Sequence, residues 1–179
     1  VVVLAVRHGN PKNIHDWADL RRADVEVLTP NVRTSGGAMW NVAAIWGAAL
    51  RGKTPVAGND PAAAQGLLHD ILARVRIMDR SGRDSMLSFE RGVGDVAITY
   101  ENEVLLGRSQ GRDYEYVVPA SSVRIQNPAS IVDRNVDRHH SLDVAEAFVA
   151  FLTSPEAQRI YARHGLRPVD ESVARETSS

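Results

Sequence analysis

Short β-type runs alternate with helical patterns along this 179-residue chain, and this alternation limits the fold more than any other feature. β-type runs are expected at 1–7, 25–28, 75–78, 95–100, 114–118 and 123–132. Helical patterns are expected at 16–20, 35–50, 61–75, 84–92, 101–108, 144–152 and 154–165. Strands that alternate with helices are typical of an α/β fold, in which helices flank a parallel-rich sheet.

The sharpest local motif is Thr34-Ser35-Gly36-Gly37-Ala38, which follows a predicted strand and opens a predicted helix. A helix N-terminus leaves backbone N–H groups unpaired and carries a partial positive charge. Two glycines let an anion approach the backbone, and Ser35 adds a hydroxyl donor, so the segment suits an oxyanion. A Ser cap with glycines that ease a tight turn would give the same motif, and both interpretations stay open here. Within this helix, Trp40 and Trp46 are expected in the core.

A second helix start, Ser81-Gly82-Arg83-Asp84-Ser85, offers similar groups. Asp84 and Ser85 are cap-type residues before the short helix that is expected to end at Gly92. Taken alone, this segment is better interpreted as a surface turn with a cap. Two such starts in one α/β chain nevertheless favour a shared anion site, because loops at the carboxyl ends of strands converge on one crevice.

The charge balance and the residue types exclude several classes of protein. The chain has 21 Lys and Arg against 22 Asp and Glu, so it lacks the basic surface of a nucleic-acid or anionic-membrane binder. It has no cysteine, which excludes disulfides, thiolate metal sites and cysteine nucleophiles. No apolar run approaches the roughly 18 residues of a membrane span.

The search for catalytic residues finds no candidate, so we expect neither an enzyme nor a cofactor. His139-His140 is better interpreted as a solvated polar turn than as a metal site. Glu101 and Glu103 would point to different faces of a helix, and a solvated helix start is the better interpretation. No nucleophile elbow occurs in the sequence.

A series of longer motifs occurs in order along the chain. They are Arg7-His8-Gly9-Asn10-Pro11-Lys12, Asp16-Trp17-Ala18-Asp19-Leu20, Thr29-Pro30-Asn31, Thr34-Ser35-Gly36-Gly37-Ala38-Met39-Trp40-Asn41, Glu90-Arg91-Gly92-Val93-Gly94-Asp95-Val96, Tyr100-Glu101-Asn102-Glu103, Tyr114-Glu115, Val117-Val118-Pro119 and Ser154-Pro155-Glu156-Ala157-Gln158. Together they resemble the periplasmic sulfate-binding proteins, the substrate-binding subunits of sulfate/thiosulfate ABC importers. The match runs from about the first residue to Pro168, and the ordered series is specific.

The resemblance implies one lobe of a two-lobed, type II periplasmic-binding-protein fold, with sulfate held in the cleft. Residues 1–115 would form the second lobe, including the incoming crossover strand. Residues 116–179 would form the return crossover and helices that pack on the first lobe. Family members are longer, so we expect a first lobe before Val1 and a continuation past Asp170. Without them, residues 1–6 and 144–152 should expose apolar surface, which predicts self-association or partial disorder at those segments.

The resemblance also assigns donors to the anion. The hydroxyl of Ser35 and the backbone N–H groups of Gly36 and Gly37 match the family's Ser-Gly-Gly contacts. Another backbone N–H comes from a Gly-Ala-Arg-Gly loop, and matching its arginine gives Gly82 as the donor, with Arg83 beside it. Ser81 is the alternative donor.

Two positions depart from the family pattern. Tyr100 occupies the position of a tryptophan whose indole N–H binds the anion, and a phenol can accept as well as donate. Met39 replaces an arginine that lies behind the contact residues. Both departures concern the strength of binding more than the place of the site.

The implied ligand is sulfate or thiosulfate, and the implied partner is the membrane permease of an ABC importer. The implied location is periplasmic or extracellular, with the protein free or lipid-anchored. Sulfate offers acceptors only, so a site of neutral donors suits it. Hydrogen phosphate would leave its proton unpaired there, at a cost of about 1–3 kcal/mol. The alternative functions are the anion-sensing effector domain of a transcription regulator and an enzyme acting on a sulfate or phosphate ester.

Overall fold

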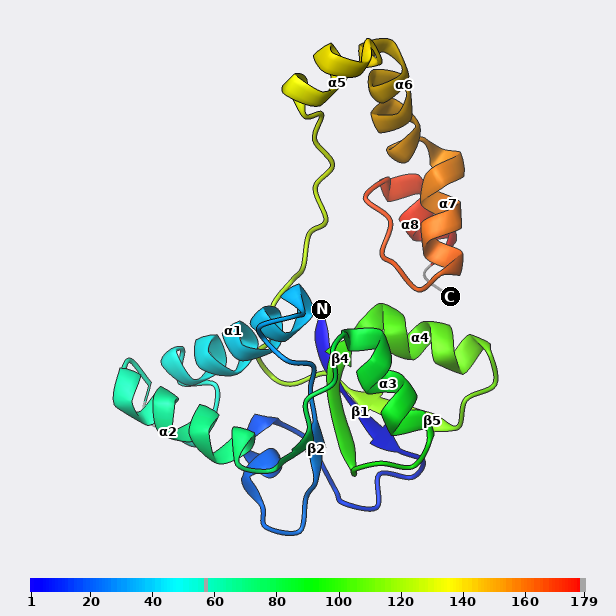
Figure 1. Cartoon of the computed structure of the whole chain (residues 1–179). Coiled ribbons are helices and arrows are strands. Elements are labelled where there is room, and N and C mark those ends of the chain that lie inside the picture. Colours follow the sequence, from blue (N-terminus) through cyan, green and yellow to red (C-terminus); the bar gives the residue numbers. More distant parts are fainter. Residues whose placement is uncertain (57, 178–179) are drawn as a thin grey trace. The chain divides into compact units, whose positions relative to one another are not determined.

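The computed structural model describes residues 1–56 and 58–177, and they form two compact units (Figure 1). The first unit is Val1–Ile125 and the second is Gln126–Ser179. The boundary predicted from the sequence, between residues 115 and 116, falls inside strand β5 (Tyr114–Val117). This strand belongs to the sheet of the first unit, so the structural division comes later along the chain.

The first unit contains a five-stranded sheet with the order β3-β2-β4-β1-β5. Its other strands are β1 (Val2–Arg7), β2 (Val27–Leu28), β3 (Val75–Ile77) and β4 (Val96–Tyr100). Strand β2 is parallel to β3 and β4, whereas β1 is antiparallel to both of its neighbours, β4 and β5. Four strands therefore run one way and β1 runs against them. The predicted α/β fold with a parallel-rich sheet is confirmed.

Strand β1 is buried on both faces of the sheet. Because side chains alternate along a strand, Val2, Leu4 and Val6 enter one core cluster and Val3 and Ala5 enter the other. All five side chains are at most 1% exposed. A continuous apolar run is typical of such a strand. The expectation that this segment exposes apolar surface was wrong, because β4 and β5 cover its edges and helices cover its faces.

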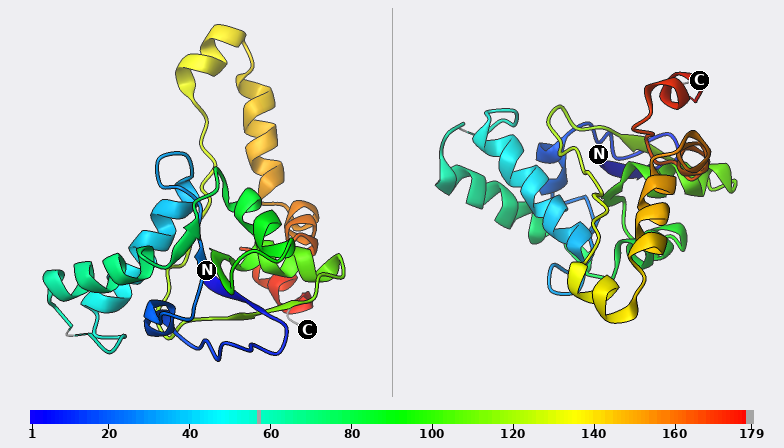
Figure 2. Two further views of the ribbon diagram at one scale, coloured as in Figure 1. Left: turned by 60° about the horizontal axis from the view of Figure 1, so that its bottom comes forward. Right: turned by 90° about the horizontal axis from the view of Figure 1, so that it is seen from above.

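Helices cover the two faces of this sheet in separate layers (Figures 1 and 2). One layer contains α1 (Gly36–Leu50), α2 (Pro61–Leu72) and the 3₁₀ helix η1 (Trp17–Arg21). The other contains α3 (Gly82–Glu90) and α4 (Glu101–Ser109). Each layer buries its own apolar stripe against one face of β1 and β4, which makes two cores separated by the sheet.

The buried face of α1 differs from the predicted one. Trp40 is 43% exposed and Trp46 is only partly buried. The inner stripe is made of four alanines, one isoleucine and one amide: Ala38, Asn41, Ala44, Ile45, Ala48 and Ala49. Small side chains let the helix lie close to the sheet, and the bulky indole of Trp40 points away from the core.

Three local predictions need correction. Helix α3 begins at Gly82, because Ser81 rather than Asp84 or Ser85 is its cap. The stretch 123–132 forms no strand in the described chain; Val123 and Ile125 instead pack on the first core cluster. The polar turn predicted around His139 is the end of helix α5 (Asp133–His139), which stops because His140 adopts a left-handed conformation.

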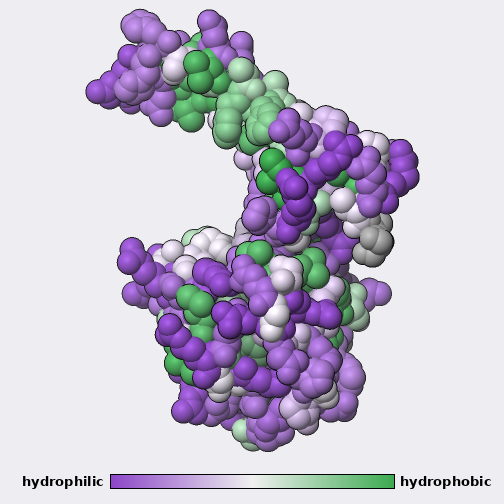
Figure 3. Space-filling view, turned by 90° about the vertical axis from the view of Figure 1, so that its right-hand side faces the viewer, coloured by the Kyte–Doolittle hydropathy of each residue, from purple (hydrophilic) through white to green (hydrophobic). Residues whose placement is uncertain are grey.

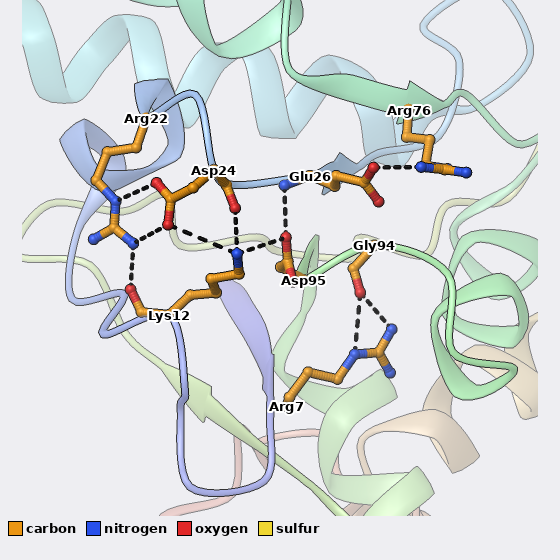
Figure 4. Close-up of polar contacts among 8 residues, drawn as sticks. All are labelled: Arg7, Lys12, Arg22, Asp24, Glu26, Arg76, Gly94 and Asp95. Atoms are coloured by element: carbon orange, nitrogen blue, oxygen red, sulfur yellow. Dashed lines mark hydrogen bonds and ion pairs between the residues drawn. The ribbon is translucent and has the colours of Figure 1, made fainter.

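A polar network holds together the loops at the amino ends of β2 and β4 (Figure 4). Asp95 Oδ2 accepts a hydrogen bond of 2.9 Å from the backbone N–H of Glu26. The Lys12 ammonium lies 3.7 Å from the carboxylate of Asp24 and 4.0 Å from that of Asp95. At the end of β1, the Arg7 guanidinium donates to the backbone carbonyls of Phe89, Val93 and Gly94.

The second unit contains α5, α6 (Leu142–Leu152), α7 (Pro155–Arg163) and α8 (Glu171–Glu176). Consecutive helices contact one another. None of the described α6 residues is buried; Val144 is 72% and Phe148 60% exposed. Hydrophobic side chains gather on the surface of this unit (Figure 3). Among the described helices, none combines the length and the apolar character needed to cross a membrane.

We predict opposite effects for two glycine-to-alanine substitutions in helices. A Cβ on Gly107 would overlap the hydroxyl of Tyr114, whose ring is buried, so Gly107→Ala should cost about 1–3 kcal/mol. The control, Gly66→Ala in α2, meets no described atom within 4 Å and should gain about 0.5–1 kcal/mol. Urea unfolding measures both, and a Gly107→Ala variant as stable as the wild type would contradict the packing of α4 on β5.

We also predict that the 179-residue chain self-associates through the apolar face of α6. Sedimentation velocity should detect dimers or larger species that become more abundant at higher protein concentration. Phe148→Gln removes an exposed ring and introduces a residue that favours the helix. This variant should therefore shift the population toward monomer without unfolding α6. A wild-type chain that stays monomeric at every concentration would contradict this prediction.

Candidate functional site

A cavity of about 180 Å³ lies where three helices of the first unit begin. Its lining includes Ser35 just before α1, Gly82 at the first position of α3 and Tyr100 just before α4. The carboxyl ends of β2 and β4 point to this edge of the sheet. Open α/β sheets bind their ligands at this edge.

The loops that precede α1 and α3 are tied together. The backbone N–H of Asn31 donates to the carbonyl of Asp79 at 2.8 Å. The hydroxyl of Thr34 donates to the carbonyl of Arg80 at 2.7 Å. These two bonds join segments that are far apart in sequence, so the N-termini of α1 and α3 approach the cavity together.

The two helix starts use their serines differently. Ser81 caps α3, because its hydroxyl oxygen accepts from the N–H of Asp84 at 3.1 Å and its proton goes to the Asp84 carboxylate. Ser35 occupies the same position before α1, but its side chain makes no capping hydrogen bond to any described residue. The first turn of α1 therefore keeps unpaired N–H groups beside a hydroxyl, which is an arrangement that favours an anion.

Tyr100 brings its phenol to the start of α1. A Cβ built on Gly37 would lie 3.2 Å from the Tyr100 hydroxyl and 3.3 Å from the Ser35 hydroxyl. The absence of a side chain at Gly37 thus lets two hydroxyls and a helix N-terminus meet. Partial burial raises the pKa of Tyr100 above its usual 10.0, so the phenol keeps its proton at neutral pH and can donate it.

The ion pair of Arg83 with Glu103 forms part of the cavity wall. Arg83 Nη1 lies 3.5 Å from Glu103 Oε2 and 3.8 Å from Glu90 Oε1. The prediction that Glu101 and Glu103 form a solvated helix start was wrong. Glu101 is 5% exposed, and Glu103 lines the cavity, where the Arg83 cation balances its charge.

The structure brings most of the residues predicted for the site around this one cavity. Ser35, Gly37, Gly82, Arg83 and Tyr100 all line it. Gly36 occupies the first position of α1 but lies outside the lining of the described cavity. Whether these residues bind an anion stays a prediction.

Asn41 is a lining residue that the sequence reasoning missed. It is 2% exposed, and its amide nitrogen donates to Thr29 Oγ1 and to the carbonyl of Ile98, both at 3.0 Å. A sequence signal existed, since Asn41 is the polar member of the inner stripe of α1, three residues after Ala38. A polar residue at a core position of a helix needs hydrogen-bond partners, and here Thr29 and Ile98 provide them.

Within the described chain, no group of three His, Asp or Glu side chains is placed to hold a metal ion. The predicted polar pair His139-His140 lies at the end of α5 in the second unit.

The sequence pattern of the bacterial extracellular solute-binding proteins matches residues 1–167. The chain belongs to this family.

The Sulfate-binding protein of Escherichia coli K12 is 44% identical over 177 residues, which are 97% of this chain and 53% of that protein. The Thiosulfate-binding protein of the same organism is 40% identical over 158 residues, 87% of this chain and 46% of that protein. The structure of the sulfate-binding protein SubI from Mycobacterium tuberculosis H37Rv superposes with a TM-score of 0.87 at 36% identity, over 99% of this chain and 59% of SubI. The resemblance inferred from the ordered motifs is confirmed. This chain spans about half the length of the curated relatives it matches.

We predict that Tyr100 ionises above the pH at which an ordinary tyrosine does. Because burial raises its folded-state pKa, the stability it contributes is present below the ordinary value of 10.0 and is lost as pH rises through the folded value. Ultraviolet difference titration of the wild type against Tyr100→Phe isolates this group from the other tyrosines. A Tyr100 component that ionises at or below the ordinary value would contradict the burial of the phenol in the cavity wall.

Proposed function

We propose that this chain captures sulfate, or the related thiosulfate, in the cavity at the starts of α1, α3 and α4. In this proposal it acts outside the cytoplasm as the solute-binding subunit of an ABC importer and delivers the anion to a membrane permease. The names of the curated relatives and of SubI support the choice of ligand. The observation that carries the proposal is the convergence of three helix N-termini on one cavity beside a serine that does not cap its helix.

The donors proposed for the anion are neutral. They are the hydroxyls of Ser35 and Tyr100 and the backbone N–H groups of Gly36, Gly37 and Gly82. Sulfate carries acceptors only, so each of these groups can donate to it without leaving a ligand proton unpaired. The partial positive charges at the helix starts attract the dianion without a full counter-charge.

Arg83 has a different proposed role from the other site residues. Its guanidinium is already paired with the carboxylates of Glu103 and Glu90. We therefore assign it the task of neutralising the acidic wall, which would otherwise repel an anion. This role keeps the cavity close to electrically neutral, and a neutral cavity permits release as well as capture.

A binding protein fits this site better than the two alternatives weighed from the sequence. The family is described as solute-binding, and the curated relatives are named for the anion they bind. An ester-cleaving enzyme would need a nucleophile or a base aimed at the ligand, and the assigned donors supply hydrogen bonds alone. The proposal does not include a lipid anchor.

The first test is an NMR titration of the 179-residue chain, a method that detects even weak binding. With sulfate, the backbone amide signals of Gly36, Gly37 and Gly82 should shift and saturate, because the anion accepts their hydrogen bonds. The amide of Gly66, an exposed position of α2 that does not line the cavity, serves as the control in the same spectrum. Chloride at matched ionic strength separates binding from screening. Equal shifts with sulfate and chloride, or shifts only away from the cavity, would contradict the proposal.

The same titration tests the role of Tyr100. Tyr100→Phe removes one hydroxyl and should weaken sulfate binding by about 0.5–3 kcal/mol, the range for a hydrogen bond, with the higher values for a charged partner. Tyr116→Phe is the matched control, because Tyr116 is a partly buried tyrosine in β5 that packs on the other core cluster. Equal affinities for the wild type and Tyr100→Phe would mean that Tyr100 only packs against the core.

A further inference from the structure

A second hollow of the first unit is an open groove between η1 and the C-terminal end of α2. Its volume is about 540 Å³, against about 180 Å³ for the cavity at the helix starts. None of its lining residues belongs to the lining of that cavity. The lining includes Ala18, Arg21, Arg22, Asp70, Ala73 and Arg74. The groove is therefore a separate feature, with room for a group larger than a single tetrahedral anion.

Two of the three arginines in this lining are already paired within the chain. Arg21 Nε and Nη2 donate to Asp70 Oδ2 at 2.9 and 2.6 Å, which joins η1 to α2. The guanidinium of Arg22 donates to the carboxylate of Asp24 and to the backbone carbonyl of Lys12 (Figure 4). Both cations are thus compensated by carboxylates of the first unit.

Arg74 is the third cation, and it has no such partner. It makes no ion pair and no side-chain hydrogen bond with any residue that the structure describes, and its Nε is buried without an acceptor. Its backbone is held on both sides, since its N–H donates to the carbonyl of Ile71 at 3.0 Å and its carbonyl accepts from the N–H of Val27 at 2.9 Å. The residue is partly exposed and lines the groove. A guanidinium carries five N–H donors, so the fold leaves Arg74 with unused donors at a fixed place.

A carboxylate matches what this groove lacks. Once the two arginine pairs are formed, one positive charge remains in the lining, and a carboxylate carries one negative charge. The planar fork of a guanidinium also fits a carboxylate through two parallel hydrogen bonds. We propose that the groove between η1 and α2 is a second binding site, in which a carboxylate accepts from the terminal nitrogens of Arg74. This inference does not depend on the proposed function, because the two sites share no lining residue.

Asp70 lies in the same groove but is engaged elsewhere. The hydrogen bond from Arg21 holds the pKa of Asp70 below its ordinary value of 3.8, so this carboxylate stays ionised and paired at neutral pH. Ala18 and Ala73 carry short side chains, which keep the groove open beside this pair. In this proposal the carboxylate comes from outside the described chain, as a free organic acid or as an acidic side chain of a partner protein.

The test is an NMR titration of the 179-residue chain with two probes, acetate and a tetraglutamate peptide. With either probe the backbone amide signals of Ala18 and Ala73 should shift and saturate, and chloride at matched ionic strength should not reproduce these shifts. Tighter binding of the peptide would indicate an acidic partner segment, and equal affinities per carboxylate would indicate a free acid. Shifts that chloride reproduces, or tighter binding of sulfate than of both probes at these two amides, would overturn the proposal. The signal of Gly36 reports on the other cavity, so failure of one site is distinguishable from failure of the other.

Two arginine variants separate a specific contact from general attraction. Arg74→Gln removes the proposed donors and should weaken tetraglutamate binding about tenfold or more, as expected for the loss of hydrogen bonds to a charged group. Arg76→Gln is the matched control, because it removes the same charge nearby, whereas Arg76 pairs with Glu26 and does not line the groove. Its affinity should stay within about twofold of the wild type. Equal losses in the two variants, or an Arg74→Gln variant that binds like the wild type, would overturn the proposal.

Arg74→Lys and urea unfolding complete the test. Lysine keeps the positive charge but lacks the planar fork, so Arg74→Lys should also bind the peptide more weakly than the wild type. Because the Arg74 side chain has no partner in the described chain, all three variants should remain folded in the absence of urea. An Arg74→Lys variant with wild-type affinity would overturn the two-bond geometry assigned to Arg74.

Discussion

The first unit depends on the pairing of β1 between β4 and β5. This strand lies inside the sheet, runs against its neighbours and is buried on both faces. Its alternating side chains supply both core clusters, so the two helical layers share one central element. At the amino ends of β2 and β4, the sheet has a polar edge where Lys12 pairs with Asp24 and Asp95. At the carboxyl ends of the same two strands, three helices begin. The cavity is a direct result of that polarity.

The chemistry of the cavity follows from which hydrogen bonds the fold uses. The hydroxyl of Ser81 is used by the cap of α3, whereas the hydroxyl of Ser35 makes no capping bond to the described residues. The amide protons of Asn41 are used to join α1 to the strands, and its buried oxygen accepts no hydrogen bond from the described residues. Hence the same structural bonds that build the first unit determine which donors and acceptors remain for a ligand. An anion that needs several neutral donors fits what remains.

The sequence alone predicted the parts that rest on local chemistry. The helical ranges expected at 35–50 and 61–75 place the starts of α1 and α2 to within one residue, and most of the residues assigned to the site line one cavity. Parts that depend on distant partners could not be predicted. Whether β1 is covered depends on β4 and β5, and the orientation of Asn41 depends on Thr29 and Ile98. The outward position of Trp40 follows from the small residues that let α1 approach the sheet, which is a property of packing rather than of the residue itself.

The contact of Arg7 with the end of α3 has an electrostatic consequence for the dipole of that helix. A helix carries a negative pole at its carbonyl end and a positive pole at its amino end. The guanidinium of Arg7 donates to the carbonyl of Phe89 in the last turn of α3, at 2.7 Å, and to the two carbonyls of Val93 and Gly94 beyond it. A fixed cation thus compensates the negative pole, and the carboxylate of Asp84 lies in the first turn, at the positive pole. Each pole of helix α3 therefore meets a charge of the opposite sign, and the residue responsible at the carbonyl end lies at the far edge of the sheet.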